Sequence, residues 1–186
     1  MVRYTDILKM AKESKIPVRG YLSCVVACPY EGSIDPRTVA HRTQQLFDMG
    51  CYEVSLGETI GVATVASTRS MLQAVTAAVP AERLAVHFHD TYGQAVANTL
   101  VALEDFDIRV VDAAVAGLGG CPYAPGAAGN LASEDLLYLL DGWGITTGVD
   151  MAKLVEAATF VTGILKQPSR SKAGVAFAAK QAAICK

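Results

Sequence analysis

The chain has 186 residues, 52% hydrophobic and 18% charged, with a formal net charge of −2. This length and composition favour one globular domain over residues 1–186 and argue against disorder. The weakly acidic balance offers no positive field for nucleic acid. No apolar run reaches the about 20 residues that a membrane-spanning helix needs, so we expect neither kind of partner.

Four strand-then-helix units follow one another along the chain. The expected strands cover residues 18–27, 52–56, 84–89 and 109–116, and the expected helices cover 37–49, 65–79, 94–104 and 133–140. Asp35 before Pro36 is typical of a helix start, and Pro80 ends the second helix. A further helix is expected over 151–165, and the alanine-rich tail is expected to be helical. This alternation predicts an α/β fold with a parallel sheet.

Two α/β architectures fit this order of elements. A doubly wound sheet would carry a glycine-rich phosphate turn, G-x-G-x-x-G, after its first strand, and none follows any strand here. A TIM-type (β/α)8 barrel instead collects polar residues at the carboxyl ends of its strands, which is the pattern found. A complete barrel takes about 250 residues, so we expect half of one: about four strand-helix units plus C-terminal helices.

The sequence His87-Phe88-His89-Asp90 ends the third strand. Residues two apart on a strand point to one face, so both imidazoles are expected to project together, where they can hold a divalent cation. The alternative is that one histidine caps a turn and the other bonds within the core. His41 falls in the middle of a helix and is expected at the surface.

The long loop from Gly117 to Asn130 follows the fourth strand. Its glycines permit close approach to a ligand, and a loop of this length is typical of a functional cover. Cys121, within it, could serve as a proton donor or nucleophile, or be a buried thiol without a role. Asn130 could supply a metal-binding oxygen or cap the following helix.

Polar residues at the end of the second strand, Ser55, Glu58 and Thr59, are candidates for binding polar substrate groups or for bracing a metal ligand, with turn formation as the alternative. Asp112 lies in an apolar strand and should be paired. Glu134 and Asp135 are expected to decorate the first turn of a helix.

The five cysteines, odd in number and irregularly spaced, predict free thiols in a reducing compartment. Cys24, Cys28 and Cys51 are expected to be small core residues. The spacing of Cys24 and Cys28 occurs in zinc sites, but no second pair follows.

Four segments together resemble the 3-hydroxy-3-methylglutaryl-CoA lyase family: VRGYLSCVVACPYEG, GCYEVSLGETIGV, HFHDTYGQAVANTL and VAGLGGCPYAPGAAGN. The resemblance is to the C-terminal part of those enzymes and covers essentially the whole chain. The H-x-H-D element is shared with a wider superfamily of metal-dependent barrels that includes condensing synthases, whereas the cysteine loop is specific to the lyases.

The resemblance implies a (β/α)8 barrel that binds Mg²⁺ or Mn²⁺ and cleaves the acyl-CoA substrate into acetyl-CoA and acetoacetate. His87, His89 and Asn130 match the metal ligands of the family, and Cys121 matches its catalytic cysteine. It further implies a homodimer in the full-length form, and a cytoplasmic location for a bacterial protein or mitochondrial targeting by a segment upstream. Cys185 is similar to a redox-sensitive cysteine of some members.

Two departures from the family pattern stand out. Glu58 replaces a common aspartate, and nothing before Val18 matches the first barrel strand, which carries an arginine and a metal-binding aspartate. We therefore expect the isolated chain to be inactive or nearly so. A related synthase running condensation, and a non-catalytic half-barrel that pairs with another chain, are the alternatives. Arg19 is a candidate for CoA binding on its charge alone.

Overall fold

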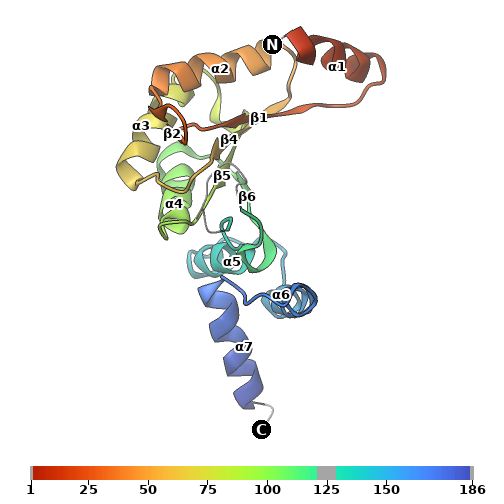
Figure 1. Ribbon diagram of the computed structural model, residues 1–186, viewed down its shortest axis with the longest axis vertical. Helices are drawn as coiled ribbons and strands as arrows, with labels where there is room; N and C mark the ends of the chain where they lie inside the picture. The colour runs from red at the N-terminus through yellow and green to blue at the C-terminus, as the bar shows by residue number, and fades with distance from the viewer. Residues whose placement is uncertain (1, 121–128, 185–186) are drawn as a thin grey trace.

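A computed structural model describes residues 2–120 and 129–184 and contains a four-stranded parallel sheet (Figure 1). The strands are β1 (Arg19–Ser23), β4 (Glu53–Glu58), β5 (Leu84–Phe88) and β6 (Val110–Asp112), hydrogen-bonded in that order. Each strand pairs in parallel with the next along the chain, so the carboxyl ends of all four meet at one edge of the sheet. The expected α/β architecture, a partial barrel of parallel strands, is confirmed.

Helices connect successive strands and lie on one side of the sheet. They are α2 (Pro36–Asp48), α3 (Val65–Thr76) and α4 (Ala95–Phe106), and a short 3₁₀ turn, η1 (Ala81–Arg83), precedes β5. The side chain of Asp35 accepts a hydrogen bond from the amide of Arg37 at the start of α2, as its position before Pro36 predicted. Thr64 and Ser67 cap α3 reciprocally.

The core lies between these helices and the sheet. Alternate residues of β4 and β5 face it, namely Val54, Leu56, Leu84, Val86 and Phe88, and all five are fully buried. The period of two along a strand sends the intervening side chains to the opposite face. That face carries Ser55, Gly57, Ala85 and His87, so the polar residues of the strands share one side of the sheet.

Two of the expected strands are shorter than predicted. β1 ends at Ser23, and the chain then forms a two-stranded hairpin, β2 (Ala27–Cys28) with β3 (Gly32–Ser33). Cys24 has a positive φ of 60°, which turns the backbone out of the strand. The fourth strand likewise ends at Asp112, and a 3₁₀ turn, η2 (Val115–Gly117), contains Ala116 at φ 57°. Apolar, β-branched composition alone did not reveal these left-handed positions.

Four further helices flank the strand-helix units: α1 (Val2–Glu13) before β1, and α5 (Ser133–Gly142), α6 (Met151–Leu165) and α7 (Lys172–Ile184) after β6. α7 extends away from the sheet in Figure 1. Within the described ranges, no helix combines the length and the apolar character needed to cross a membrane.

Candidate metal and substrate site

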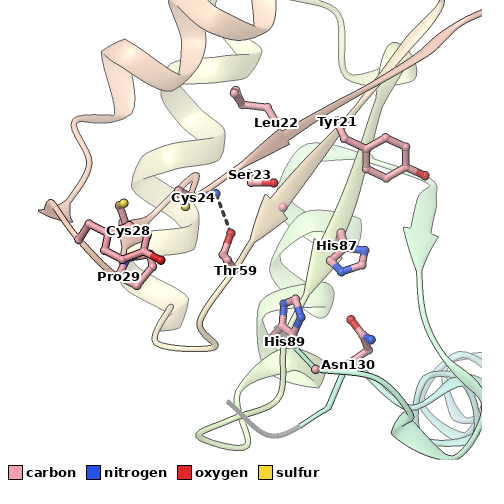
Figure 2. Close-up of a pocket in the computed structure, with 13 residues that line it drawn as sticks. Tyr21, Leu22, Ser23, Cys24, Cys28, Pro29, Thr59, His87, His89 and Asn130 are labelled. Carbon is pink, nitrogen blue, oxygen red and sulfur yellow. Dashed lines mark hydrogen bonds between the residues drawn. The ribbon is translucent and has the colours of Figure 1, made fainter. Parts of the chain in front are cut away.

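A cavity of about 610 Å³ opens at the carboxyl edge of the sheet (Figure 2). β1, β4, β5, the β2–β3 hairpin and the chain on both sides of residues 121–128 contribute to its lining. The lining residues are Tyr21, Leu22, Ser23, Cys24, Cys28, Pro29, Tyr30, Gly57, Thr59, His87, His89, Gly120 and Asn130. Several of the polar residues predicted from strand ends therefore meet in one place, as a parallel sheet requires.

The two histidines face this cavity together, with ring centroids 5.2 Å apart. His89 is nearly buried, and its Nδ1 lies 2.7 Å from the backbone carbonyl oxygen of Glu58. A carbonyl only accepts, so this contact assigns the proton to Nδ1 and leaves Nε2 with a lone pair. A carbonyl that fixes the ring of a histidine in this way is the usual support of a metal ligand.

His87 is supported by a carboxylate instead. Its Nδ1 lies 3.5 Å from Oδ2 of Asp112, on the neighbouring strand β6. Asp112 is itself held by the Ser55 hydroxyl, which donates to Oδ2 at 2.8 Å, and by two nitrogens of Arg19 at 3.0 and 3.1 Å. Asp112 is thus paired, as its place in an apolar strand predicted.

For both His87 and Asp112, burial and a neighbouring opposite charge shift the pKa in opposite directions. Burial lowers the pKa of His87, His89 adds to that effect, and Asp112 and Asn130 oppose it. Burial alone would raise the pKa of Asp112, but hydrogen bonds from Arg19 and Ser55 outweigh it, and the pKa lies below its ordinary value. A neutral imidazole beside an ionised carboxylate is the state that binds a cation.

Asn130 lies beside the two histidines at the cavity (Figure 2). Its backbone pairs with that of His89, and its Nδ2 donates to the Leu118 carbonyl at 2.9 Å. Its Oδ1 is buried without a hydrogen bond of ordinary geometry from any described residue. A buried oxygen without a hydrogen-bond partner destabilises the fold unless another group binds it. An amide oxygen beside two imidazoles matches the mixed N/O donor set that several divalent cations accept.

Asn130 does not cap the following helix, because the residue before α5 is Ala132 and no side chain caps it. Over residues 2–120 and 129–184, no cluster of three or more His, Cys, Asp and Glu side chains is placed to hold a metal ion. Two histidines and one amide are the candidate metal donors among the described residues of this cavity, and Cys24 with Cys28 forms no zinc cluster there.

The three residues predicted to bind substrate have different surroundings. Thr59 lines the cavity, and its hydroxyl accepts a hydrogen bond from the Cys24 amide at 2.8 Å. Ser55 and Glu58 are fully buried and are absent from the cavity lining. Burial raises the pKa of Glu58, whose Oε1 accepts from the Val62 amide. Substrate contact stays a prediction for Thr59, and the geometry of Ser55 and Glu58 favours support of the two histidines.

The expectation that Cys24 and Cys28 are core residues needs correction, and the one for Glu134 is confirmed with an addition. Cys24 and Cys28 line the cavity and are only half-buried, so Cys51 alone of the three is a core residue. Glu134 lies in the first turn of α5 but is fully buried, and both its oxygens accept from the Ala116 amide. Burial raises the pKa of this carboxyl.

Asp135 and Arg19 also have structural partners that the sequence did not show. Asp135 accepts hydrogen bonds from the Ser171 hydroxyl and the Ala173 amide at the start of α7. Arg19, a candidate for CoA binding, belongs to the Asp112 cluster. His41 is exposed, as expected. Cys121 and Cys185 lie outside the described residues.

Comparisons with known proteins give a consistent picture. Residues 1–161 match the family model described as HMGL-like. The chain is 57% identical over 170 residues to the mitochondrial hydroxymethylglutaryl-CoA lyase of Bos taurus, which covers 91% of this chain and 52% of that protein. The chain spans about half the length of the curated relatives it matches.

Solved structures agree with the sequence matches. The crystal structure of hydroxymethylglutaryl-CoA lyase from Pseudomonas aeruginosa superimposes with a TM-score of 0.92 at 54% identity, covering 96% of this chain and 59% of that one. An HMG-CoA lyase from Acinetobacter baumannii, solved in complex with coenzyme A and 3-methylmalate, gives a TM-score of 0.84 at 32% identity and covers 91% and 55%.

Proposed function

The chain belongs to the HMGL-like family, and we propose that it is the C-terminal half of a 3-hydroxy-3-methylglutaryl-CoA lyase barrel. The reaction would be cleavage of that thioester to acetyl-CoA and acetoacetate. The observation that carries the proposal is the convergence of two imidazoles and an unsatisfied amide oxygen on one cavity at the carboxyl edge of the sheet. Relatives at 54–57% identity are named as lyases, which favours cleavage over condensation.

We propose that His87, His89 and Asn130 hold a divalent cation, Mg²⁺ or Mn²⁺. Bound there, the cation would supply the positive charge that lowers the pKa of the substrate's tertiary hydroxyl. His89 presents Nε2 because its Nδ1 proton is donated to the Glu58 carbonyl. His87 is oriented by Asp112, whose charge also stabilises a cation beyond the ring.

The remaining chemistry is a carbon–carbon cleavage. The hydroxyl gives up its proton to water in the cavity, the bond to the acetyl-CoA methylene breaks, the ketone of acetoacetate forms, and the electron pair stays on the methylene carbon. That carbanion takes a proton, which we assign to the thiol of Cys121, giving acetyl-CoA. The A. baumannii structure with coenzyme A supports an acyl-CoA ligand.

Mn²⁺ binding tests the metal assignment on this chain alone. Electron paramagnetic resonance should show one bound Mn²⁺ per wild-type chain and loss of binding in His89→Ala. His41→Ala, which removes an exposed histidine on α2, is the matched control and should bind like the wild type. Equal Mn²⁺ binding by wild type and His89→Ala would contradict the assignment.

Acetoacetate release from 3-hydroxy-3-methylglutaryl-CoA tests the lyase assignment. The measurement compares the isolated chain with the chain extended by its upstream coding sequence. We expect little or no release from the isolated chain and full turnover from the extended one. In the extended enzyme, Cys121→Ala should lower turnover severely while metal content stays the same. Loss of the metal in that variant would make the assignment of Cys121 wrong.

A further inference from the structure

We infer that Arg170 is a positioning residue for Asn130, which it holds in place by joining the two chain segments next to it. Arg170 lies between α6 and α7, beyond residues 1–161 that match the family model. The inference rests on the proposed function, because it concerns the amide oxygen that we assign to the metal.

The guanidinium group of Arg170 contacts both segments. Its Nη1 donates to the Gly119 carbonyl at 3.1 Å, on the segment that precedes residues 121–128. The same nitrogen and the Cδ atom lie 2.9 and 3.1 Å from where a Cβ on Gly129 would stand, on the segment that follows. The arginine therefore packs directly on a glycine backbone, an approach that any larger residue at 129 would block.

The backbone of Arg170 is fixed at the same place. Its amide donates to the Ala116 carbonyl at 3.0 Å, and its Cβ lies 3.2 Å from where a Cβ on Gly117 would stand. Ala116 is held in turn by the buried carboxylate of Glu134. Next to Arg170, the Ser171 hydroxyl donates to Asp135 on α5. These contacts set the start of the arginine side chain against the end of η2.

The segments that Arg170 joins determine where the Asn130 amide points. Asn130 Nδ2 donates to the Leu118 carbonyl, and it lies 2.7 Å from where a Cβ on Gly119 would stand. On the other side, the Gly129 carbonyl accepts from the Asp90 amide at 3.1 Å, next to His89. If the Gly119 and Gly129 segments separate, Nδ2 loses its acceptor and Oδ1 can turn away from the imidazoles.

Two readouts on the full chain test this inference: hydrogen exchange of the Asp90 amide and the affinity for Mn²⁺ alone. Arg170→Ala should speed Asp90 exchange several-fold, and should weaken Mn²⁺ binding by about tenfold, the range found when a group supporting a metal ligand is removed. Arg170→Lys restores a hydrogen-bond donor but not the planar contact with Gly129. It should therefore recover part of the Mn²⁺ affinity and part of the slow Asp90 exchange.

Arg83→Ala is the matched control. Arg83 is also exposed and also donates to backbone carbonyls, those of Cys51 and Tyr52, but it lies away from the cavity. It should leave Asp90 exchange and Mn²⁺ affinity at wild-type values whatever its effect on thermal stability. A purely structural role for Arg170 would give the same pattern as Arg83.

The outcomes separate this inference from the proposed function. Wild-type exchange at Asp90 in Arg170→Ala would overturn the inference, as would unchanged Mn²⁺ affinity in a chain that binds Mn²⁺. If the wild-type chain binds no Mn²⁺, the metal assignment fails, and the exchange of the Asp90 amide alone tests the inference. Faster exchange in Arg170→Ala then supports the positioning of the Asn130 segment, and unchanged exchange refutes it.

Discussion

Arg19→Met removes the cation that pairs with two carboxylates on the face of the sheet opposite the helices. Arg19 pairs with Asp112 and with Glu53, and the side chains of the three residues are 18%, 24% and 14% exposed. Removing one partner of a buried ion pair costs about 3–5 kcal/mol, because the other charge is left uncompensated. Water reaches about a fifth of this cluster, so we expect the lower end, about 3 kcal/mol of unfolding free energy.

Urea unfolding at pH 7 measures this loss, and its pH dependence identifies the cause. The pKa of Asp112 lies below its ordinary 3.8, so its pairing stabilises the wild type above that pH and is lost as pH falls through the lower, folded value. The difference between wild type and Arg19→Met should therefore shrink in acid. Adding Asp112→Asn to Arg19→Met should cost less than the sum of the two single changes.

Arg69→Met is the control for a surface arginine. Arg69 pairs with Asp105, and their side chains are 51% and 32% exposed, so its loss should cost less than about 1 kcal/mol. Equal costs for Arg19→Met and Arg69→Met, or additive behaviour of Arg19→Met with Asp112→Asn, would refute the view that the Arg19 cluster is a coupled, partly buried unit.

Three further predictions concern packing and charge near the site. Gly129→Ala places a methyl group against the Gly117 carbonyl oxygen and should destabilise the fold by about 1–3 kcal/mol in urea unfolding. Gly163→Ala, in an open position on α6, is the comparison and should stabilise the fold by about 0.8 kcal/mol. Ser55→Ala removes a hydroxyl that donates to a carboxylate and should cost about 1.5 kcal/mol by the same measurement. Because burial raises the pKa of Glu134 above 4.5, the wild type should lose stability relative to Glu134→Gln as pH rises from 4.5 towards the folded pKa, and a pH-independent difference would contradict this.

The sequence predicted those parts of the fold that depend on local periodicity. The alternation of strands and helices gave the parallel sheet, and the spacing of two between His87 and His89 placed both rings on one face. The cap at Asp35 was equally local. These features depend on residues within a few positions of one another, so a single sequence contains the information.

The supports of the site could not be predicted in that way. The partners of Asp112 are 93 and 57 residues away along the chain, and only the order of strands in the sheet brings Arg19 and Ser55 to it. Arg170 reaches Gly119 across 51 residues. Such pairs carry no local signal. A charged residue in an apolar strand, such as Asp112, predicts that a partner exists but does not identify it.

The glycines around Asn130 show how the two kinds of information combine. A run of glycines indicated close approach to a ligand, but the structure shows that Gly129 and Gly119 first admit the protein's own groups, Arg170 and the Asn130 amide. Backbone freedom is used there to bring two chain segments together, so that the Asn130 amide nitrogen is satisfied while its oxygen has no hydrogen bond of ordinary geometry from a described residue. The proposed metal-binding role of Asn130 requires an oxygen that is held in place and still free to coordinate, and these glycines allow both at once.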